Sequence, residues 1–149
     1  MAVRVQSGDF DPGAELSSFV QEAASAGAVV TFTGLVRDIA GGLQYLEIEH
    51  YPAMTQSALE SLEATALTKW KLQSCLIIHR YGRLNLGETI MMVATAAPHR
   101  AAAFEAADFL MDNLKSRAPF WKKEVSKNSE TWVQSKDTDK AALRRWKFK

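Results

Sequence analysis

The apolar stretch over residues 75–98 constrains the fold of this chain more than any other feature. Its sequence, CLIIHRYGRLNLGETIMMVATAAP, contains two apolar runs separated by a region with Gly82, Asn85 and Gly87. Apolar runs of this length, bounded by turn residues, are typical of buried strands. We therefore expect two neighbouring strands, joined through the glycine-containing turn region.

Three other segments carry apolar residues at helical spacing and are predicted as helices. The first covers residues 12–26, where Asp11 and Pro12 supply an N-cap and a first-turn proline. The second covers residues 54–70 and the third residues 99–116. The residues expected on their apolar sides are Leu16, Phe19, Val20 and Ala23, then Met54, Ala58, Leu59, Leu62, Ala66 and Trp70, and finally Ala103, Phe104, Ala107, Leu110, Met111 and Leu114.

Further strands are expected between and after these helices. Residues 28–37 are rich in β-branched side chains, and residues 43–51 alternate between apolar and polar side chains. Residues 118–125 and 130–136 could form a short pair of strands, followed by a helical turn over 139–146. Helices and strands thus mix in an α+β pattern.

Length and composition exclude several classes of protein. The 149 residues, with no linker or repeat, suit a single domain over 1–149. A net charge of +1 predicts no polyanion partner, and no apolar run suits a signal peptide or a membrane span, so we expect a cytoplasmic protein. The single cysteine, Cys75, excludes an intrachain disulfide, and with three histidines it argues against a structural zinc site. Because Cys75 lies in a strand-like run, we expect it to be buried rather than a nucleophile.

Basic residues gather around the third predicted helix. His99 and Arg100 stand at its start, Lys115 stands near its end, and Lys122 and Lys123 follow a proline turn. The rise along the helix separates Arg100 from Lys115 by roughly 20 Å. Residues from both ends can therefore contribute to one pocket only if a neighbouring element or another subunit brings them together. Lys115 and Lys122, in contrast, can direct both ammonium groups into one small cavity.

Two interpretations of this cluster stay open on the residues alone. Basic residues near a helix C-terminus are favoured by the helix dipole by about 0.3 to 1 kcal/mol each, without any further role. Alternatively, the aromatic residues of PFWKK could dehydrate a neighbouring lysine and lower its pKa, which would let it exchange protons near neutral pH. Arg37 and the pair of His99 and Arg100 could then hold an anionic substrate.

Five motifs follow one another between about residue 27 and residue 146. They are GAVVTFTGLVRD, LEIEHYPAMT, IIHRYGRLNLGE, APHRAAAFEAADFLMDNLKSRAPFWKKE and the stretch from Trp132 to Trp146. In order and spacing they resemble the MoaE family, the large subunits of molybdopterin synthase. Any one motif alone would be a weak signal, whereas the ordered set is specific.

The resemblance implies an α/β hammerhead fold, in which a mixed sheet is packed by helices and a small additional β subdomain is attached. It implies a sulfurtransferase, molybdopterin synthase, which forms the dithiolene of molybdopterin in molybdenum cofactor biosynthesis. The sulfur comes from the thiocarboxylated Gly-Gly terminus of a small ubiquitin-like carrier of the MoaD type and goes to cyclic pyranopterin monophosphate. Family members form a homodimer, and a heterotetramer with two carriers. No metal and no organic cofactor is implied.

The resemblance also implies roles for particular residues. The essential lysines of the family fall on Lys115, which would position the carrier tail and transfer protons, and on Lys122, which would stabilise charge on the pterin intermediate. Some contacts come from the partner protomer in the family. Leu35 and Lys136 stand at positions that vary among relatives. The implied substrate-binding residues are Phe32, Arg37, His99, Arg100, Lys123 and Glu124.

Two other classes of function remain open. A binding module for a ubiquitin-like protein would keep an apolar docking face but would not need the lysine pair. A nucleic-acid binder could use Trp121, Trp132 and the terminal sequence DKAALRRWKFK as stacking and phosphate-binding groups, although the net charge of +1 argues against it.

Overall fold

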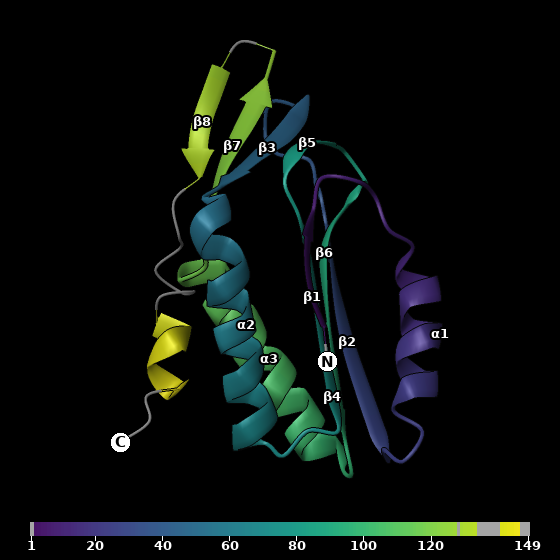
Figure 1. Ribbon diagram of the computed structural model, residues 1–149. Helices are drawn as coiled ribbons and strands as arrows, with labels where there is room; N and C mark the ends of the chain where they lie inside the picture. Colours follow the sequence, from purple (N-terminus) through teal and green to yellow (C-terminus); the bar gives the residue numbers. More distant parts are fainter. Residues whose placement is uncertain (1, 128, 134–140, 147–149) are drawn as a thin grey trace.

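The computed structural model describes residues 2–127, 129–133 and 141–146, and its strands form two sheets (Figure 1). Sheet A has the strand order β1-β4-β6-β2, and sheet B has the order β5-β3-β7-β8. The strands are β1 (Ala2–Gln6), β2 (Ala28–Leu35), β3 (Tyr45–His50), β4 (Ser74–Arg80), β5 (Gly82–Asn85), β6 (Thr89–Ala97), β7 (Phe120–Ser126) and β8 (Ser129–Val133). The helices are α1 (Pro12–Glu22), α2 (Pro52–Lys69), α3 (Arg100–Ser116) and the 3-10 turn η1 (Leu143–Trp146).

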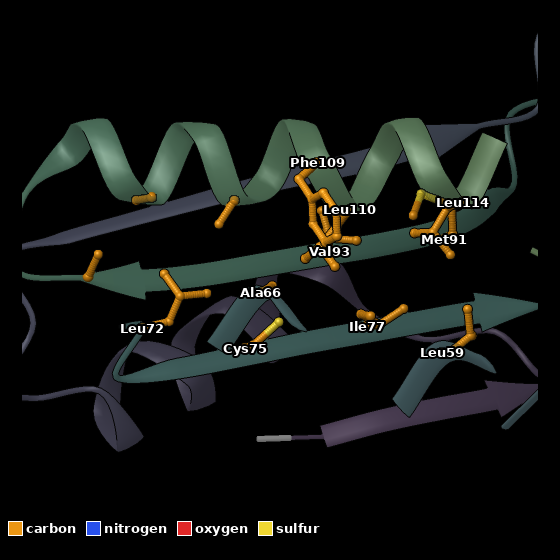
Figure 2. Packing of buried hydrophobic residues seen from close by; sticks show 13 residues of the cluster. Leu59, Ala66, Leu72, Cys75, Ile77, Met91, Val93, Phe109, Leu110 and Leu114 are labelled. Atoms are coloured by element: carbon orange, nitrogen blue, oxygen red, sulfur yellow. The ribbon is translucent and has the colours of Figure 1, made fainter. Parts of the chain in front are cut away.

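Sheet A is the mixed sheet at the centre of the molecule. β1 runs parallel to β4, whereas β6 runs antiparallel to both of its neighbours, β4 and β2. Helix α1 covers one face, and α2 and α3 cover the other (Figure 1). On the α3 side, Leu110 and Leu114 point from the helix toward Val93 and Met91 of β6 (Figure 2). Apolar side chains from alternate positions of the strands thus pack against helices on both faces of sheet A.

Sheet B stands beyond one end of sheet A and is antiparallel throughout (Figure 1). Its inner face carries Leu46, Ile48 and Leu84, which form a third apolar cluster. β5 follows β4 directly in the sequence but pairs with β3. The chain therefore crosses from one sheet to the other between Arg80 and Gly82, and the two sheets are held together at that point.

The α+β class predicted from the sequence is confirmed, as are the two neighbouring strands in residues 75–98, which are β4 and β6. The predicted turn region between them differs, because it contains the strand β5. Gly82 begins this strand and Gly87 follows it, and their φ values of +92° and +83° allow the chain to leave and re-enter sheet A.

Helix α1 ends at Glu22, earlier than the predicted residue 26. The Asp11 carboxylate caps its start by accepting hydrogen bonds from two backbone N–H groups, as expected. Its end differs because the chain must turn into β2, where Gly27 passes so close to the Pro98 carbonyl oxygen that a Cβ would lie 2.2 Å from it. Gly27 is therefore needed for this close approach and does not cap the helix.

Three residues predicted on the apolar sides of helices are exposed instead. These are Val20 of α1, Met54 of α2 and Phe104 of α3. The buried residues of these helices include Phe19 in α1, Leu59 in α2 and Leu110 in α3. The other predicted helix residues are buried or half-buried.

The C-terminal turn η1 packs on α3. Trp146 and Arg145 donate hydrogen bonds to the Asp112 carboxylate, and the Trp146 ring makes edge contacts with Phe109 and Trp70. The predicted strand 130–136 is observed as far as Val133. Residues 134–136, including Lys136, and residues 139–140 of the predicted helical turn lie outside the described residues. None of the described helices is long and apolar enough to cross a membrane.

Candidate functional site

The main cavity is a pocket of about 670 Å³ between the two sheets and the C-terminal end of α3. One wall comes from the ends of β2, β4 and β6 in sheet A. A second wall comes from α3 and the turn that follows it, and a third comes from the inner face of sheet B. The pocket is lined by Phe32, Thr33, Gly34, Leu35, Val36, Arg37, Ile39, Leu43, Leu46, His79, Ile90, Met91, Met111, Leu114, Lys115, Ser116, Ala118, Phe120, Lys122, Glu124 and Val133.

Lys115 reaches the pocket from the last turn of α3. The helix ends in a tight turn, in which the N–H groups of Arg117 and Ala118 both donate to the Asn113 carbonyl oxygen, at 2.8 and 3.1 Å. Asn113 is itself buried, and its side-chain amide donates to the Phe109 carbonyl oxygen at 2.9 Å. This tight turn allows β7 to begin at Phe120, so the chain returns to the pocket within a few residues of Lys115.

Lys122 reaches the pocket from the inner face of β7. In the antiparallel pairing with β3, Lys122 stands opposite Ile48, and both side chains lie on the face that carries the third apolar cluster. Glu124 occupies the next position on the same face and also lines the pocket. The structure therefore brings Lys115 and Lys122 into one cavity, together with a carboxylate.

Arg37 enters the pocket from the loop after β2. This loop is held to the turn before β6, because the Val36 N–H donates to Glu88 and the Val36 carbonyl accepts from Gly87, at 2.9 and 2.8 Å. The Asp38 carboxylate closes the loop by accepting from the N–H groups of Ile39 and Leu43, at 2.8 and 2.7 Å. The same two hydrogen bonds lower the pKa of Asp38 below its ordinary value.

Apolar side chains form the rim of the pocket. Phe32 and Leu35 line it from β2 and are both exposed to a large degree. Gly34 lies between them, and the pairing of β2 with β6 shifts register after Gly34. Phe32, expected as a pocket wall, is thus found there, and Leu35 contributes an apolar surface rather than a polar contact.

Three other predicted site residues lie outside this pocket. His99 and Arg100 are exposed at the opposite end of α3, in keeping with the distance expected along the helix. Lys123 projects from the other face of β7, where its ammonium group lies 3.7 Å from the carboxylates of Glu47 and Glu130. The pocket of one chain therefore contains five of the predicted site residues, namely Phe32, Arg37, Lys115, Lys122 and Glu124.

Three polar side chains of the pocket, those of Thr33, His79 and Ser116, were not among the predicted site residues. His79 comes from the end of β4, inside an apolar run that marks it only as a strand residue. Ser116 follows Lys115 in the last turn of α3, and among the described residues its buried hydroxyl has no hydrogen-bond partner. Since Ser116 is next to a predicted catalytic lysine, its position at the pocket could have been inferred, whereas that of His79 could not.

Cys75 is buried, as predicted. Burial raises the pKa of its thiol to about 12, with the nearby carboxylate of Glu63 acting in the same direction. The thiol is therefore protonated at neutral pH and does not serve as a nucleophile. Among the residues that the structure describes, no three His, Cys, Asp or Glu side chains are placed to hold a metal ion.

A pocket of this size, with apolar walls and several cations, defines a protein that can bind a small anionic molecule between two sheets. The model of the MoaE protein family matches residues 5–117, and the chain belongs to this family.

Individual relatives and solved structures agree with this membership. The molybdopterin synthase catalytic subunit of Cereibacter sphaeroides is 58% identical over 146 residues, which cover 98% of this chain and 100% of that protein. The solved MoaE protein of Burkholderia ambifaria is 46% identical, with 98% of both chains covered and a TM-score of 0.83. A Helicobacter pylori structure, the complex of subunit 1 and 2 of molybdopterin-converting factor, contains a chain of the same fold at 21% identity and a TM-score of 0.77, covering 90% of this chain and 91% of that one. The fold expected from the family resemblance is thus confirmed.

Proposed function

We propose that this chain is the catalytic subunit of molybdopterin synthase. In this proposal it works as a single domain in the cytoplasm and transfers sulfur from the thiocarboxylated terminus of a small ubiquitin-like carrier to cyclic pyranopterin monophosphate. The observation that carries the proposal is the convergence of Lys115 and Lys122 in one pocket. The relative from Cereibacter sphaeroides, a molybdopterin synthase catalytic subunit, supports the assignment over the whole length of the chain.

The chemistry of the pocket fits a reaction whose nucleophile comes from outside the chain. The only cysteine is buried and protonated, so the attacking sulfur must be that of the carrier. Lys115, at the mouth of the pocket, would position the carrier tail and transfer protons as the sulfur attacks. Lys122 would stabilise the charge that develops on the pterin intermediate, and Arg37 would bind the phosphate.

The carrier tail has a suitable route into the pocket along its apolar rim. Phe32, Leu35 and Val133 line the pocket and are exposed, so they offer a surface that a narrow Gly-Gly tail can follow. The Helicobacter pylori chain of the same fold was solved in a complex with a second subunit, which supports a carrier partner here as well.

His99, Arg100 and Lys123 enter the proposal through a homodimer. His99 and Arg100 lie at the far end of α3 from Lys115, so they would reach a pocket only in a second protomer. We therefore propose a homodimer that binds two carriers as a heterotetramer. Lys123 would act at the edge of the site, if it exchanges its partners Glu47 and Glu130 for substrate.

The direct test is reconstitution from purified components. The chain is mixed with a thiocarboxylated small subunit and cyclic pyranopterin monophosphate, and molybdopterin is measured. A carrier with an ordinary carboxylate at its terminus is the matched control, because it can bind but has no sulfur to transfer. Molybdopterin formed only with the thiocarboxylated carrier supports the proposal.

The other outcomes point to the rival functions. A stable complex with the carrier and no molybdopterin would favour a binding module without catalysis. Salt-dependent binding of single-stranded nucleic acid, in place of carrier binding, would favour a nucleic-acid binder.

A further inference from the structure

His79 lies where sheet A meets sheet B, and its imidazole forms part of the pocket wall. It is the penultimate residue of β4 and is 2% exposed. Its neighbours in the pocket include Lys115, Lys122 and Glu124, which the proposed function uses. A histidine buried beside a lysine pair calls for an explanation, because a third cation there would repel the two ammonium groups.

The hydrogen bonding of His79 fixes its tautomer. Nδ1 lies 2.8 Å from the Arg80 carbonyl oxygen, which can only accept, so Nδ1 carries the hydrogen. Burial lowers the pKa of His79 to about 3, the charges of Lys122 and His50 act in the same direction, and the Arg80 bond opposes them. The ring is therefore neutral at physiological pH, and its Nε2 nitrogen is a hydrogen-bond acceptor.

Phe120 connects this imidazole to the strand that carries Lys122. The rings of His79 and Phe120 are stacked, with centroids 3.8 Å apart and an angle of 15° between their planes. Phe120 and Lys122 are two residues apart in β7, so they project from the same face of the strand. The stack therefore sets the position of Lys122 relative to sheet A.

A ring behind this stack limits the movement of Phe120. The centroid of His50 lies 5.9 Å from that of Phe120 and 4.4 Å from that of Tyr81. His50 is itself fixed by a hydrogen bond of 2.9 Å between its Nδ1 and the Thr55 hydroxyl. His50 thus supports the same stack as His79, but it does not line the pocket.

We infer that His79 is a positioning residue for Lys122: the stack on Phe120 holds the imidazole beside β7, and its Nε2 nitrogen accepts a hydrogen bond that holds the Lys122 ammonium group in the pocket. This inference rests on the proposed function for its catalytic consequence, but the inferred hydrogen bond between His79 and Lys122 does not depend on that function. A neutral acceptor suits this place, because it orients an ammonium group without cancelling the positive charge that binds an anionic substrate.

Two substitutions separate the acceptor from the stack. His79→Phe keeps an aromatic ring against Phe120 and removes the acceptor, whereas His79→Gln keeps a neutral acceptor. His50→Phe is the matched control, since it alters the same aromatic layer outside the pocket. Thermal unfolding of each variant shows whether it is folded.

The first measurement needs no activity. The rate at which acetic anhydride labels each lysine is measured by mass spectrometry across a range of pH, with the exposed Lys127 as internal reference. An acceptor stabilises the ammonium form, so its loss in His79→Phe should lower the pKa of Lys122 and speed its labelling about threefold or more. Labelling in His79→Gln and His50→Phe should stay close to wild type. Unchanged labelling of Lys122 in His79→Phe would overturn the inference.

The second measurement is turnover with thiocarboxylated carrier and cyclic pyranopterin monophosphate. His79→Phe should lose roughly 10- to 100-fold in kcat with little change in KM, because a misplaced catalytic group affects the reaction more than substrate binding. His79→Gln should recover most of the loss. Equal losses in His79→Phe and His50→Phe would mean that packing alone matters and would also overturn the inference.

The two measurements keep the failures distinguishable. If the wild-type chain makes no molybdopterin, the proposed function fails while the labelling result still decides the contact between His79 and Lys122. If His79→Phe does not fold, His79→Gln carries the test: Lys122 labelled several times faster than in wild type would then contradict the inference.

Discussion

Lys122 and Lys123 are adjacent in the sequence, yet their side chains lie on opposite faces of β7. Lys122 lines the pocket, whereas Lys123 lies 3.7 Å from carboxylates of Glu47 and Glu130 and over the ring of Trp132. The alternation of a β-strand thus assigns the two ammonium groups to different environments. Only one of them is placed to act on a molecule bound in the pocket of its own chain.

We expect Lys115→Ala and Lys122→Ala to fold normally and each to lose about a hundredfold or more in kcat, the scale of a lost proton-transfer or charge-stabilising group. Folding should be kept because neither side chain belongs to an apolar cluster of the core. Turnover is measured in the reconstituted reaction. Lys127→Ala, in the turn between β7 and β8, is the control and should keep wild-type activity. Wild-type activity in both pocket variants would remove these lysines from the mechanism.

Asp38→Ala should raise the KM for the pterin substrate about fivefold and change kcat less, because it loosens the loop that carries Arg37 without touching the lysines. The Asp38 carboxylate accepts two backbone hydrogen bonds that close this loop. Since these bonds lower its pKa, the carboxylate keeps its charge across the pH range of an activity assay.

Asp9→Ala is the matched control for Asp38→Ala. Asp9 also accepts a hydrogen bond from the next backbone N–H, but it lies away from the pocket lining. It should therefore leave KM unchanged. A fall in kcat with constant KM in Asp38→Ala would show that the loop does not serve substrate binding.

The elements that could be predicted are those whose residue pattern lies within a short stretch of the sequence. The helical spacing of α2 and α3, the apolar runs of β4 and β6 and the proline turn between Lys115 and Lys122 are all visible in short windows. Convergence of the two lysines could be anticipated because few residues separate them. Because these patterns are local, the predicted ends of the helices and strands lie within a few residues of the observed ends.

Features that depend on distant pairing could not be predicted in this way. β1 and β5 have only five and four residues, and each is stabilised by pairing with a strand that lies far away in the sequence, β4 and β3 respectively. His79 has the appearance of a core residue in an apolar strand. Its place at the site follows from its contact with Phe120, 41 residues later in the chain, which no local pattern encodes.

Phe19→Ala should lower the free energy of unfolding by about 3 to 5 kcal/mol, because it empties a site between α1 and sheet A. Phe19 is 4% exposed, whereas its neighbour Val20 is 46% exposed. Val20→Ala on the same helix should therefore change stability by no more than about 0.5 kcal/mol. Urea unfolding of both variants measures the difference. Similar losses in the two would contradict the packing of α1 described above.

Glu63→Gln should make the protein more stable near neutral pH. Glu63 lies in α2 and is 3% exposed, and among the described residues one of its carboxylate oxygens has no hydrogen-bond partner. Burial raises its pKa above the ordinary value of 4.5, so the folded state binds this proton more tightly than the unfolded state does. Stability is consequently lost as pH rises from the ordinary pKa through the raised one.

The stability difference between Glu63→Gln and wild type isolates this effect, because glutamine resembles the protonated carboxyl but does not titrate. The difference should be close to zero below the ordinary pKa of 4.5, grow as the pH passes through the raised pKa, and then stay constant. Urea unfolding between about pH 4 and pH 8 measures it. Glu22→Gln, at an exposed position of α1, should show no such change with pH. A difference that is the same at every pH would mean that Glu63 gains its proton no more readily in the folded chain than in the unfolded one.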